Sequence, residues 1–245
     1  MYNQYMLTKP KLELKKENKQ LKNQISQLQK QLEQAHEVAR VDPLTKVDNR
    51  RGLNIEIEKL ADKIQRKEDN ILEKTCILLM LDLNDFKKIN DTLGHATGDE
   101  YLKKTAKFLK ENFRPYDEIS RIGINSKKDG NHGVSRVGGD EFVVFLIADR
   151  DITKEIQERL EKSLKKSKYE ELNISIGMIS FKIQDLVKCI KVREKVFKTD
   201  IIKEKLMEII EKDLDNKLYQ AKELAKKNGT KGCKTSVILT ECMEF

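Results

Sequence analysis

A seven-residue repeat of apolar positions runs through the first forty residues of the chain. Leu14, Leu21, Leu28 and Ala35 fall at heptad position d, and Asn18, Ile25, Leu32 and Ala39 fall at position a. Most other positions of this segment are Lys, Glu, Gln or Asn, so the apolar stripe is narrow. Leu at d with Ile and one Asn at a favours a parallel two-stranded coiled coil, because the Asn side chains pair only when the helices are in register. We therefore expect residues 1–40 to form a dimerisation helix, with a lone amphipathic helix packed on its own domain as the alternative.

From Val41 onward, helical and strand-like patterns alternate. Helices are expected at about 50–66, at about 151–166 and over a long region that ends near 227, and 93–113 is expected to begin with a turn and continue as a helix. Strands are expected at the end of 71–83, at 174–181 and at 235–239. The segment 134–147 is expected to form two strands joined by a Gly-Gly turn. The apolar run before residue 83 suits a buried central strand. Because hairpins occur beside the alternation, we expect residues 41–245 to form an α+β domain, with a central, mostly antiparallel sheet flanked by helices.

Composition narrows the class of protein. Apolar residues make up 38% and charged residues 37% of 245, too apolar for a wholly disordered chain. No apolar run has the length of a membrane span and the N-terminus lacks a signal-peptide core, so we expect a cytoplasmic protein without a membrane partner. The net charge of +8 is the excess of 49 basic over 41 acidic residues, which indicates a solvated, Lys-rich surface rather than a nucleic-acid site.

Candidate chemistry lies at acidic residues. Asp82 ends the apolar strand, and Asp140 and Glu141 lie in a Gly-Gly-Asp-Glu turn. If the two strands are neighbours, these carboxylates converge at one edge of the sheet. Such oxygen ligands suit Mg²⁺ or Mn²⁺, and two of these ions can align an attacking oxygen, a phosphorus and a leaving oxygen. The alternative is a solvated acidic turn.

The segment LMLDLNDFKKINDTLGHATGDEYL, followed by RVGGDEFVVF, resembles the GGDEF family, the diguanylate cyclases. The segments DPLTKVDNRRG, ISIGM and LDNKLYQAK agree with further family motifs in the same order, so the resemblance covers about 42–239. It implies a ferredoxin-like, palm-type domain that binds one GTP. In a homodimer, the 3′-hydroxyl of each GTP would attack the α-phosphate of the other, which gives cyclic di-GMP and two pyrophosphates.

The resemblance also implies residue roles. Asp82, Asp140 and the Leu83 carbonyl would hold two Mg²⁺ or Mn²⁺ ions, and Glu141 would position a metal or activate the 3′-hydroxyl. Asn90 and Asp99 would read the guanine edge, Phe86 and Lys87 would lie under the phosphates, and Lys222 and Lys226 would face the phosphates from one helix. Two alternatives stay open: Asn90 as the cap of a turn, and the two helix lysines as a solvated face.

The chain departs from the family pattern in four places. Lys46 stands where the family has Gly, and Lys226 where it usually has Arg. Insertions are expected at about 122–135 and 188–205. A product-binding R-x-x-D motif would be Arg114 to Asp117, but it lies about fifteen residues upstream of its usual position.

Competing functions remain open beside the cyclase. One is a catalytically silent GGDEF domain that binds nucleotide or acts as a scaffold. Another is a palm-type cyclase that makes a different cyclic dinucleotide. A nucleic-acid-binding coiled-coil protein rests on the basic charge alone.

Overall fold

The computed structural model describes residues 16–28, 40–113, 133–193, 198–228 and 237–242. The chain divides into two compact units, Met1–Val41 and Asp42–Phe245. In the first unit, residues 16–28 form a helix. Its apolar heptad residues Leu21, Ile25 and Leu28 are 49–64% exposed. Asn18 lies in the same helix and is exposed, and the other heptad positions, 14, 32, 35 and 39, lie outside the described residues.

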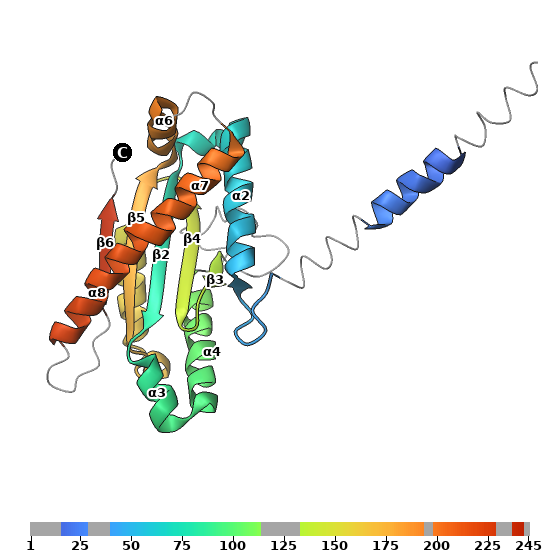
Figure 1. The fold of residues 1–245 in the computed structure, drawn as a ribbon. Helices are drawn as coiled ribbons and strands as arrows, with labels where there is room; N and C mark the ends of the chain where they lie inside the picture. Colours follow the sequence, from blue (N-terminus) through green and yellow to red (C-terminus); the bar gives the residue numbers. More distant parts are fainter. Residues whose placement is uncertain (1–15, 29–39, 114–132, 194–197, 229–236, 243–245) are drawn as a thin grey trace, which may run out of the picture. The chain divides into compact units, whose positions relative to one another are not determined.

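The second unit is built on one mixed sheet of six strands in the order β1-β3-β4-β2-β5-β6 (Figure 1). The strands are β1 (Asp48–Asn49), β2 (Thr75–Leu83), β3 (Val134–Arg136), β4 (Glu141–Ala148), β5 (Ile174–Lys182) and β6 (Val237–Cys242). The four central strands, β3, β4, β2 and β5, pair with one another in antiparallel fashion, whereas the outer strands pair in parallel, β1 with β3 and β6 with β5. Every residue of β2 is buried, because β2 lies between two strands and under helices on both faces.

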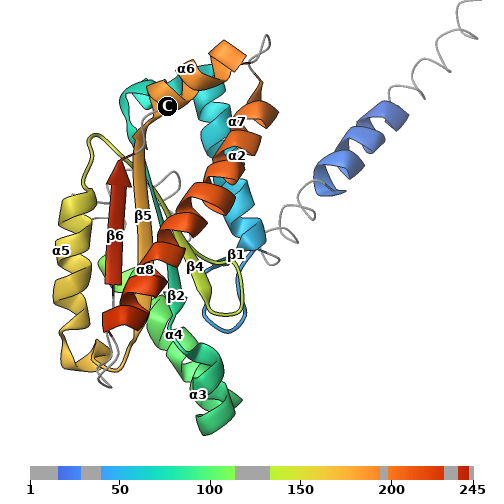
Figure 2. The ribbon, with the colours of Figure 1, turned by 60° about the vertical axis from the view of Figure 1, so that its left-hand side comes forward.

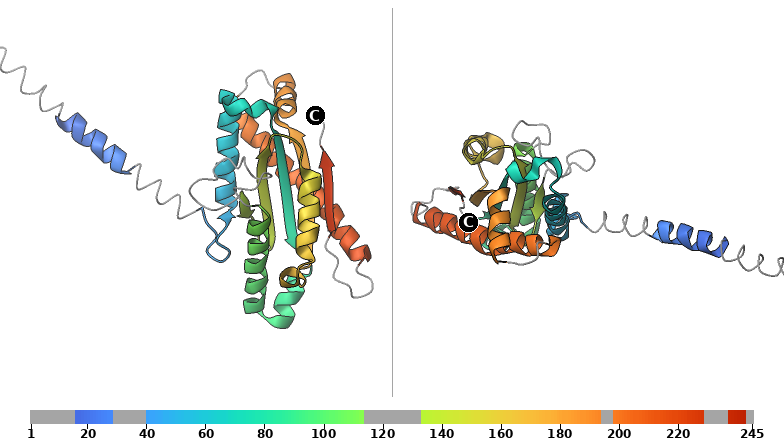
Figure 3. Two further views of the ribbon diagram at one scale, coloured as in Figure 1. Left: turned by 180° about the vertical axis from the view of Figure 1, so that it is seen from behind. Right: turned by 90° about the horizontal axis from the view of Figure 1, so that it is seen from above.

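Helices cover both faces of the sheet (Figures 2 and 3). On one face lie α2 (Arg50–Arg66), α6 (Ile183–Arg193), α7 (Thr199–Glu208), the π-helical segment η3 (Ile209–Leu214) and α8 (Asp215–Asn228). On the other lie α4 (His95–Asn112) and α5 (Thr153–Leu164), with α3 (Phe86–Leu93) at the end of β2. Two short 3-10 turns, Glu68–Glu73 and Ser167–Tyr169, complete the connections. Each face thus has its own apolar core, and the sheet separates the two.

The expected α+β fold is confirmed, and the helix over 50–66 has the predicted bounds. The expected turn at the start of 93–113 is confirmed as well. It lies at Gly94, whose positive φ of 86° lets the chain reverse between α3 and α4. The residues from His95 onward are already helical, so Gly98 lies inside α4 rather than in a loop.

Candidate functional site

The predicted acidic residues come together where β2 ends and β4 begins. Asp82 on β2 lies directly opposite Glu141, the first residue of β4, and Asp140 precedes Glu141 in the turn. On its other side, Asp82 lies opposite Ser175 of β5. This edge is the lower end of the sheet in Figure 1, where α3 follows β2. The antiparallel register therefore brings Asp82 next to two carboxylates, Asp140 and Glu141, that lie far from it in the sequence.

Asp82 is the buried member of this acidic group, with a side chain that is 10% exposed. Burial, together with the negative charges of Asp140 and Glu141, raises the pKa of Asp82 to about 6. Lys222 opposes this shift: its Nζ lies 2.8 Å from Asp82 Oδ2. The carboxylate is thus crowded by like charges and has a single ammonium group beside it.

These residues have the charge and the oxygen donors that a divalent cation needs, but they do not form a complete ligand cluster in the described ranges. No group of three His, Cys, Asp or Glu side chains is arranged as a metal cluster within the described ranges. The ammonium group at Asp82 nevertheless shows that this carboxylate accepts a cation, and Asp140 and Glu141 supply further negative charge. Mg²⁺ is commonly held by one or two carboxylates plus water and phosphate oxygens, so the donor set is compatible with such an ion.

The Gly-Gly-Asp-Glu turn is held from one side by Arg136. The guanidinium group of Arg136 donates to the Gly139 carbonyl at 3.1 and 2.6 Å, and it pairs with Asp42 at 3.3 Å. At Gly138, a Cβ would lie only 2.3 Å from Glu141 Oε2, so the absent side chain leaves room for Glu141. The turn that carries Asp140 is therefore fixed by contacts from outside the acidic group.

Asp42 anchors this brace from the start of the domain. Its carboxylate accepts hydrogen bonds from the Thr45 backbone N–H at 2.8 Å and the Thr45 hydroxyl at 2.6 Å. Burial acts to raise the pKa of Asp42, but the Thr45 hydrogen bonds and the Arg136 charge outweigh burial and lower the pKa. The same turn holds Lys46 at φ 56°, a left-handed conformation that favours glycine.

The two predicted guanine-reading residues lie on neighbouring helices, α3 and α4. Asn90 is on α3 and Asp99 is on α4, directly after Gly98. A Cβ on Gly98 would lie 1.9 Å from Asn90 Oδ1 and 3.3 Å from Phe86, so the Asn90 side chain occupies the space above this glycine. Asp99 and Lys87 are exposed, whereas Phe86 is half-buried against the core. The structure thus brings Asn90 of α3 next to Gly98 of α4, the residue that precedes Asp99.

The predicted phosphate-facing lysines lie on α8, in two different environments. Lys222 contacts Asp82 and is 32% exposed, whereas Lys226 pairs with Glu223 at 2.9 Å and is 72% exposed. Gly177 on β5 allows α8 to approach: a Cβ there would lie 2.5 Å from the Leu218 backbone N. Because Lys222 follows Leu218 by one helical turn, this close packing sets where the ammonium group lies.

A polar network beside the site was not predicted from the sequence. The Asn84 side chain donates to Asn173 Oδ1 at 2.9 Å and accepts from the Ser175 hydroxyl at 2.8 Å. These contacts join the turn after β2 to the start of β5, next to Asp82. The only sequence signal was an Asn that directly follows a buried strand.

Two sequence predictions fall partly or wholly outside the described residues. Arg114 and Asp117, the proposed product-binding pair, lie there, as does most of the insertion at 122–135. The described end of that insertion contains β3, whose Val134–Arg136 pairs with both β1 and β4. In the second insertion, at 188–205, the Thr199 hydroxyl of α7 lies 3.1 Å from Asp62 Oδ1 of α2.

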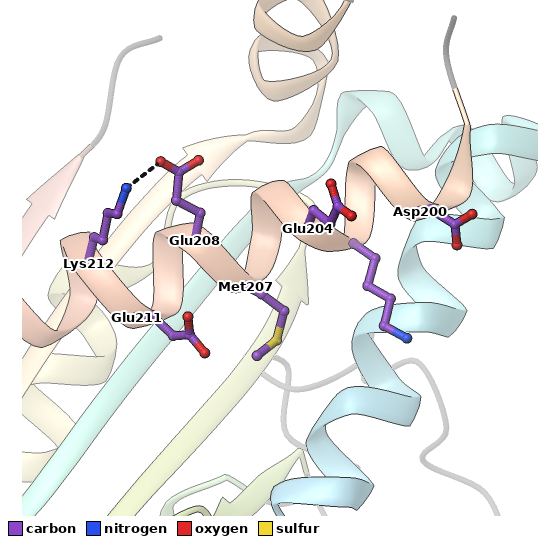
Figure 4. A pocket seen from close by; sticks show the side chains of 7 residues that line it. Asp200, Glu204, Met207, Glu208, Glu211 and Lys212 are labelled. Atoms are coloured by element: carbon purple, nitrogen blue, oxygen red, sulfur yellow. Dashed lines mark hydrogen bonds and ion pairs between the residues drawn. The ribbon is translucent and has the colours of Figure 1, made fainter.

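A hollow of about 450 Å³ lies elsewhere, on the outer side of α7 and η3 (Figure 4). Its lining residues are Asp200, Lys203, Glu204, Met207, Glu208, Glu211 and Lys212. Lys212 pairs with Glu208 at 3.0 Å, so part of this charge is neutralised internally. None of the predicted site residues lines the hollow.

Comparison with known proteins gives a family. Residues 39–126 match the family model described as "Diguanylate cyclase, GGDEF domain". The match ends before the Gly-Gly-Asp-Glu turn, and the insertion expected at 122–135 begins near its end. No helix in the described ranges combines the length and the apolar character that a membrane crossing needs.

Several curated relatives and solved structures are similar to the chain. The diguanylate cyclase DosC of Escherichia coli is 32% identical over 154 residues, which are 60% of this chain and 29% of DosC. The diguanylate cyclase DgcP of Pseudomonas aeruginosa is 32% identical over 133 residues, 54% of this chain and 17% of DgcP. The chain thus spans less than a third of these relatives. The crystal structure of the coiled coil and GGDEF domain of DgcB from Caulobacter crescentus, in complex with c-di-GMP, has a TM-score of 0.50 and 20% identity, and it covers 92% of this chain and 99% of that one, which supports the fold. The family model, the relatives and the fold agree, and the chain belongs to the GGDEF-domain family.

Proposed function

We propose that the chain is a diguanylate cyclase that condenses two molecules of GTP into cyclic di-GMP and two pyrophosphates. The observation that carries this proposal is the position of Asp82 directly opposite Glu141 on the neighbouring strand, next to Asp140 and in contact with Lys222. A phosphoryl-type transfer at this edge needs charge neutralisation and alignment of the reacting oxygens. Two Mg²⁺ or Mn²⁺ ions, when bound, supply that neutralisation.

Asp82 and Asp140 are the proposed side-chain ligands, with the Leu83 carbonyl as the third. Asp82 is fixed by the two flanking strands, and Asp140 by the Arg136 brace on its turn. Glu141 lies opposite Asp82 and is the proposed group that positions a metal or accepts the proton of the attacking 3′-hydroxyl. In each step the protein supplies orientation and charge rather than a covalent intermediate.

Asn90 and Asp99 are proposed to select guanine. A carboxylate accepts from the guanine N1–H and the 2-amino group, and an amide pairs with the acceptors of the base. Adenine lacks this pair of donors, so the chemistry favours GTP over ATP. Phe86 and Lys87 at the start of α3, and Lys222 and Lys226 on α8, are the proposed phosphate contacts.

The reaction needs two such sites facing each other, so the chain must act as a homodimer. The exposed Leu21, Ile25 and Leu28 of the N-terminal helix support pairing through a parallel coiled coil. Such tethering raises the effective concentration of one catalytic domain near the other. Replacing Asn18 by Leu should strengthen association but relax the oligomeric state, and unchanged sedimentation would contradict the proposed register.

Mass identification of the product tests the activity. Purified full-length protein with GTP and Mg²⁺ should yield cyclic di-GMP, with a specific activity that rises with protein concentration as the dimer forms. Asp140→Ala should abolish the product while the far-ultraviolet circular dichroism spectrum stays unchanged. A verified dimer that makes no product would favour a silent nucleotide-binding or scaffold protein, and a product of another mass from mixed GTP and ATP would indicate a different cyclic dinucleotide.

A further inference from the structure

Lys222 places a positive charge on the carboxylate where a divalent cation is proposed to bind. Its Nζ lies 2.8 Å from Asp82 Oδ2, which is a direct, charge-assisted hydrogen bond. Asp82 comes from β2 and Lys222 from α8, so the contact joins two elements far apart in the sequence. It is a tertiary feature of the site rather than a local pairing along one helix.

Packing holds this ammonium group in place. The α8 backbone at Lys217 and Leu218 lies so close to β5 that a Cβ on Gly177 would meet it at 2.5–2.9 Å. Lys222 is one turn further along the same helix, and its side chain is about two-thirds buried. By contrast, Lys226 is 72% exposed and is paired with Glu223 on its own helix. Of these two lysines, Lys222 is therefore the one that α8 holds against the acidic group.

A divalent cation and this ammonium group compete for the same oxygen. Mg²⁺ binds a carboxylate oxygen at 2.0–2.1 Å, as a typical value, and demands near-octahedral geometry around itself. An ammonium group hydrogen-bonded to that oxygen blocks one approach and repels the incoming ion. Two like charges this close to a partly buried carboxylate are poorly screened by water or salt. The ion pair must therefore weaken before a metal can coordinate Asp82 Oδ2.

We propose that Lys222 is a built-in counter-cation: it neutralises Asp82 in the nucleotide-free site and moves to a triphosphate oxygen when a divalent ion takes over the carboxylate. This proposal rests on the proposed function and deepens it. Lys222 then has two partners in turn, first Asp82 and then the phosphates. Because the metal alone displaces Lys222 without offering it a new anion, metal alone binds weakly. A nucleotide supplies that anion, so metal and nucleotide bind with positive coupling, which by linkage is reciprocal.

The alternative is that Lys222 only contacts phosphate, or only stabilises the fold. In either case its removal leaves the affinity of the free site for metal unchanged, or lowers it through local disorder. The two readings thus differ in the sign of one measurable quantity, the metal affinity without nucleotide. That quantity is independent of turnover.

The test is a titration of nucleotide-free, full-length protein with Mn²⁺, in which free Mn²⁺ is measured by electron paramagnetic resonance. The titration is done at pH 8, where Asp82 is ionised. Lys222→Met should bind Mn²⁺ at least about tenfold more tightly than the wild type, because the competing cation is gone. Lys226→Met removes the same charge one turn away without touching Asp82, and it should change the affinity by less than about twofold. Lys222→Gln is a second variant in case the methionine disturbs folding, which circular dichroism checks.

The coupling gives a second readout. A non-reactive GTP analogue should raise the Mn²⁺ affinity strongly in the wild type and much less in Lys222→Met. Unchanged or weaker Mn²⁺ binding by both folded Lys222 variants, with binding abolished in Asp82→Asn, would overturn the exchange while leaving the metal site intact. Equal Mn²⁺ binding by wild type and Asp82→Asn would instead overturn the metal site on which the proposed function depends.

Discussion

Two aspartates in this domain, Asp42 and Asp82, are both largely buried, yet their surroundings shift their pKa values in opposite directions. Asp42 accepts two hydrogen bonds from Thr45 and faces the Arg136 guanidinium group, and its pKa is lowered. Asp82 is desolvated beside two other carboxylates with one ammonium group in contact, and its pKa is raised to about 6. The first carboxylate stabilises the fold through its charge, whereas the second is held at a cost to the fold.

The difference separates a structural acid, Asp42, from Asp82, the acid for which we propose a function. Proteins satisfy a buried carboxylate when its only task is to hold the chain together. A strongly shifted pKa in a cluster of like charges is typical of sites that await a ligand. Arg136 connects the two regions, because it pairs with Asp42 and also supports the Gly139 carbonyl next to Asp140. Asp42, whose charge is paired, therefore supports through Arg136 the turn that carries Asp140.

The largest expected effect comes from Asp82→Asn. Loss of this proposed metal ligand should reduce turnover by about 1000-fold or more, because metal coordination contributes several kcal/mol to transition-state stabilisation. Turnover is measured as pyrophosphate release. Retention of wild-type turnover would contradict the assignment of Asp82 as a ligand.

The same variant should be more stable than the wild type when no metal is present. The pKa of Asp82 is raised from 3.8 to about 6 in the folded state, so the wild type loses stability as the pH rises across that interval. Asp82→Asn lacks this loss and should gain roughly 2 kcal/mol in the free energy of unfolding above pH 6. Urea unfolding with a chelator, from pH 4 to pH 8, measures the difference. A stability difference that does not change with pH would show that ionisation of Asp82 does not destabilise the fold.

Arg136→Met should reduce the free energy of unfolding by about 3 kcal/mol, because it leaves Asp42 without its partly buried partner. Turnover should fall as well, since the Gly139 carbonyl loses both hydrogen bonds from the guanidinium group. Arg150→Met is the matched control: Arg150 pairs with Glu155 at 2.6 Å but is 67% exposed. That exposed pair should contribute less than about 1 kcal/mol. Equal losses of unfolding free energy in the two variants would show that Arg136 contributes no more to stability than an exposed surface ion pair does.

Gly177→Ala should cost about 1–3 kcal/mol, because the added methyl group meets the α8 backbone rather than a side chain that can turn away. The displaced helix should also separate Lys222 from Asp82. Chemical denaturation of the single and double variants measures both effects: the consequence of Lys222→Met should shrink in the Gly177→Ala background. Full additivity would mean that the packing at Gly177 does not position Lys222.

Asp42→Asn should have the smallest effect, about 1 kcal/mol, because the amide oxygen still accepts from Thr45 and Arg136 keeps its hydrogen bonds to the Gly139 carbonyl. The lowered pKa of Asp42 means that its ionised form stabilises the fold above pH 3.8, and that this contribution is lost as the pH falls through the lower folded-state pKa. Wild type and variant should therefore converge in stability under acid. This trend is opposite to the one expected for Asp82, and acid unfolding curves compare the two directly.

The sequence predicted those parts of the fold that depend on local pattern. The apolar run of β2 indicated a strand covered on both faces, and the Gly-Gly turn indicated the hairpin of β3 and β4. The helix α3 over Phe86–Leu93 was not predicted. It has eight residues and none of them is buried, so no apolar period marks it in the sequence.

Contacts at the site that depend on tertiary packing escaped sequence reasoning. Lys222 was expected to face phosphates, but its pairing with Asp82 requires the close approach of α8 at Gly177, which no spacing reveals. The Asn84 network was missed because its partners, Asn173 and Ser175, lie about ninety residues away. Family resemblance indicated which residues matter, and packing decides which of them touch.

The hairpin of β3 and β4 has a consequence for solvent exchange at the acidic turn. The Phe145 backbone N donates to the Gly133 carbonyl at 2.9 Å, and the Val137 backbone N donates to the Glu141 carbonyl at 2.9 Å. The hairpin's own ladder therefore joins its two strands both beside the turn that carries Asp140 and at the far end. The amide protons of Val137 and Phe145 should accordingly be slow to exchange with deuterium, which makes them internal reporters of whether the acidic turn stays closed.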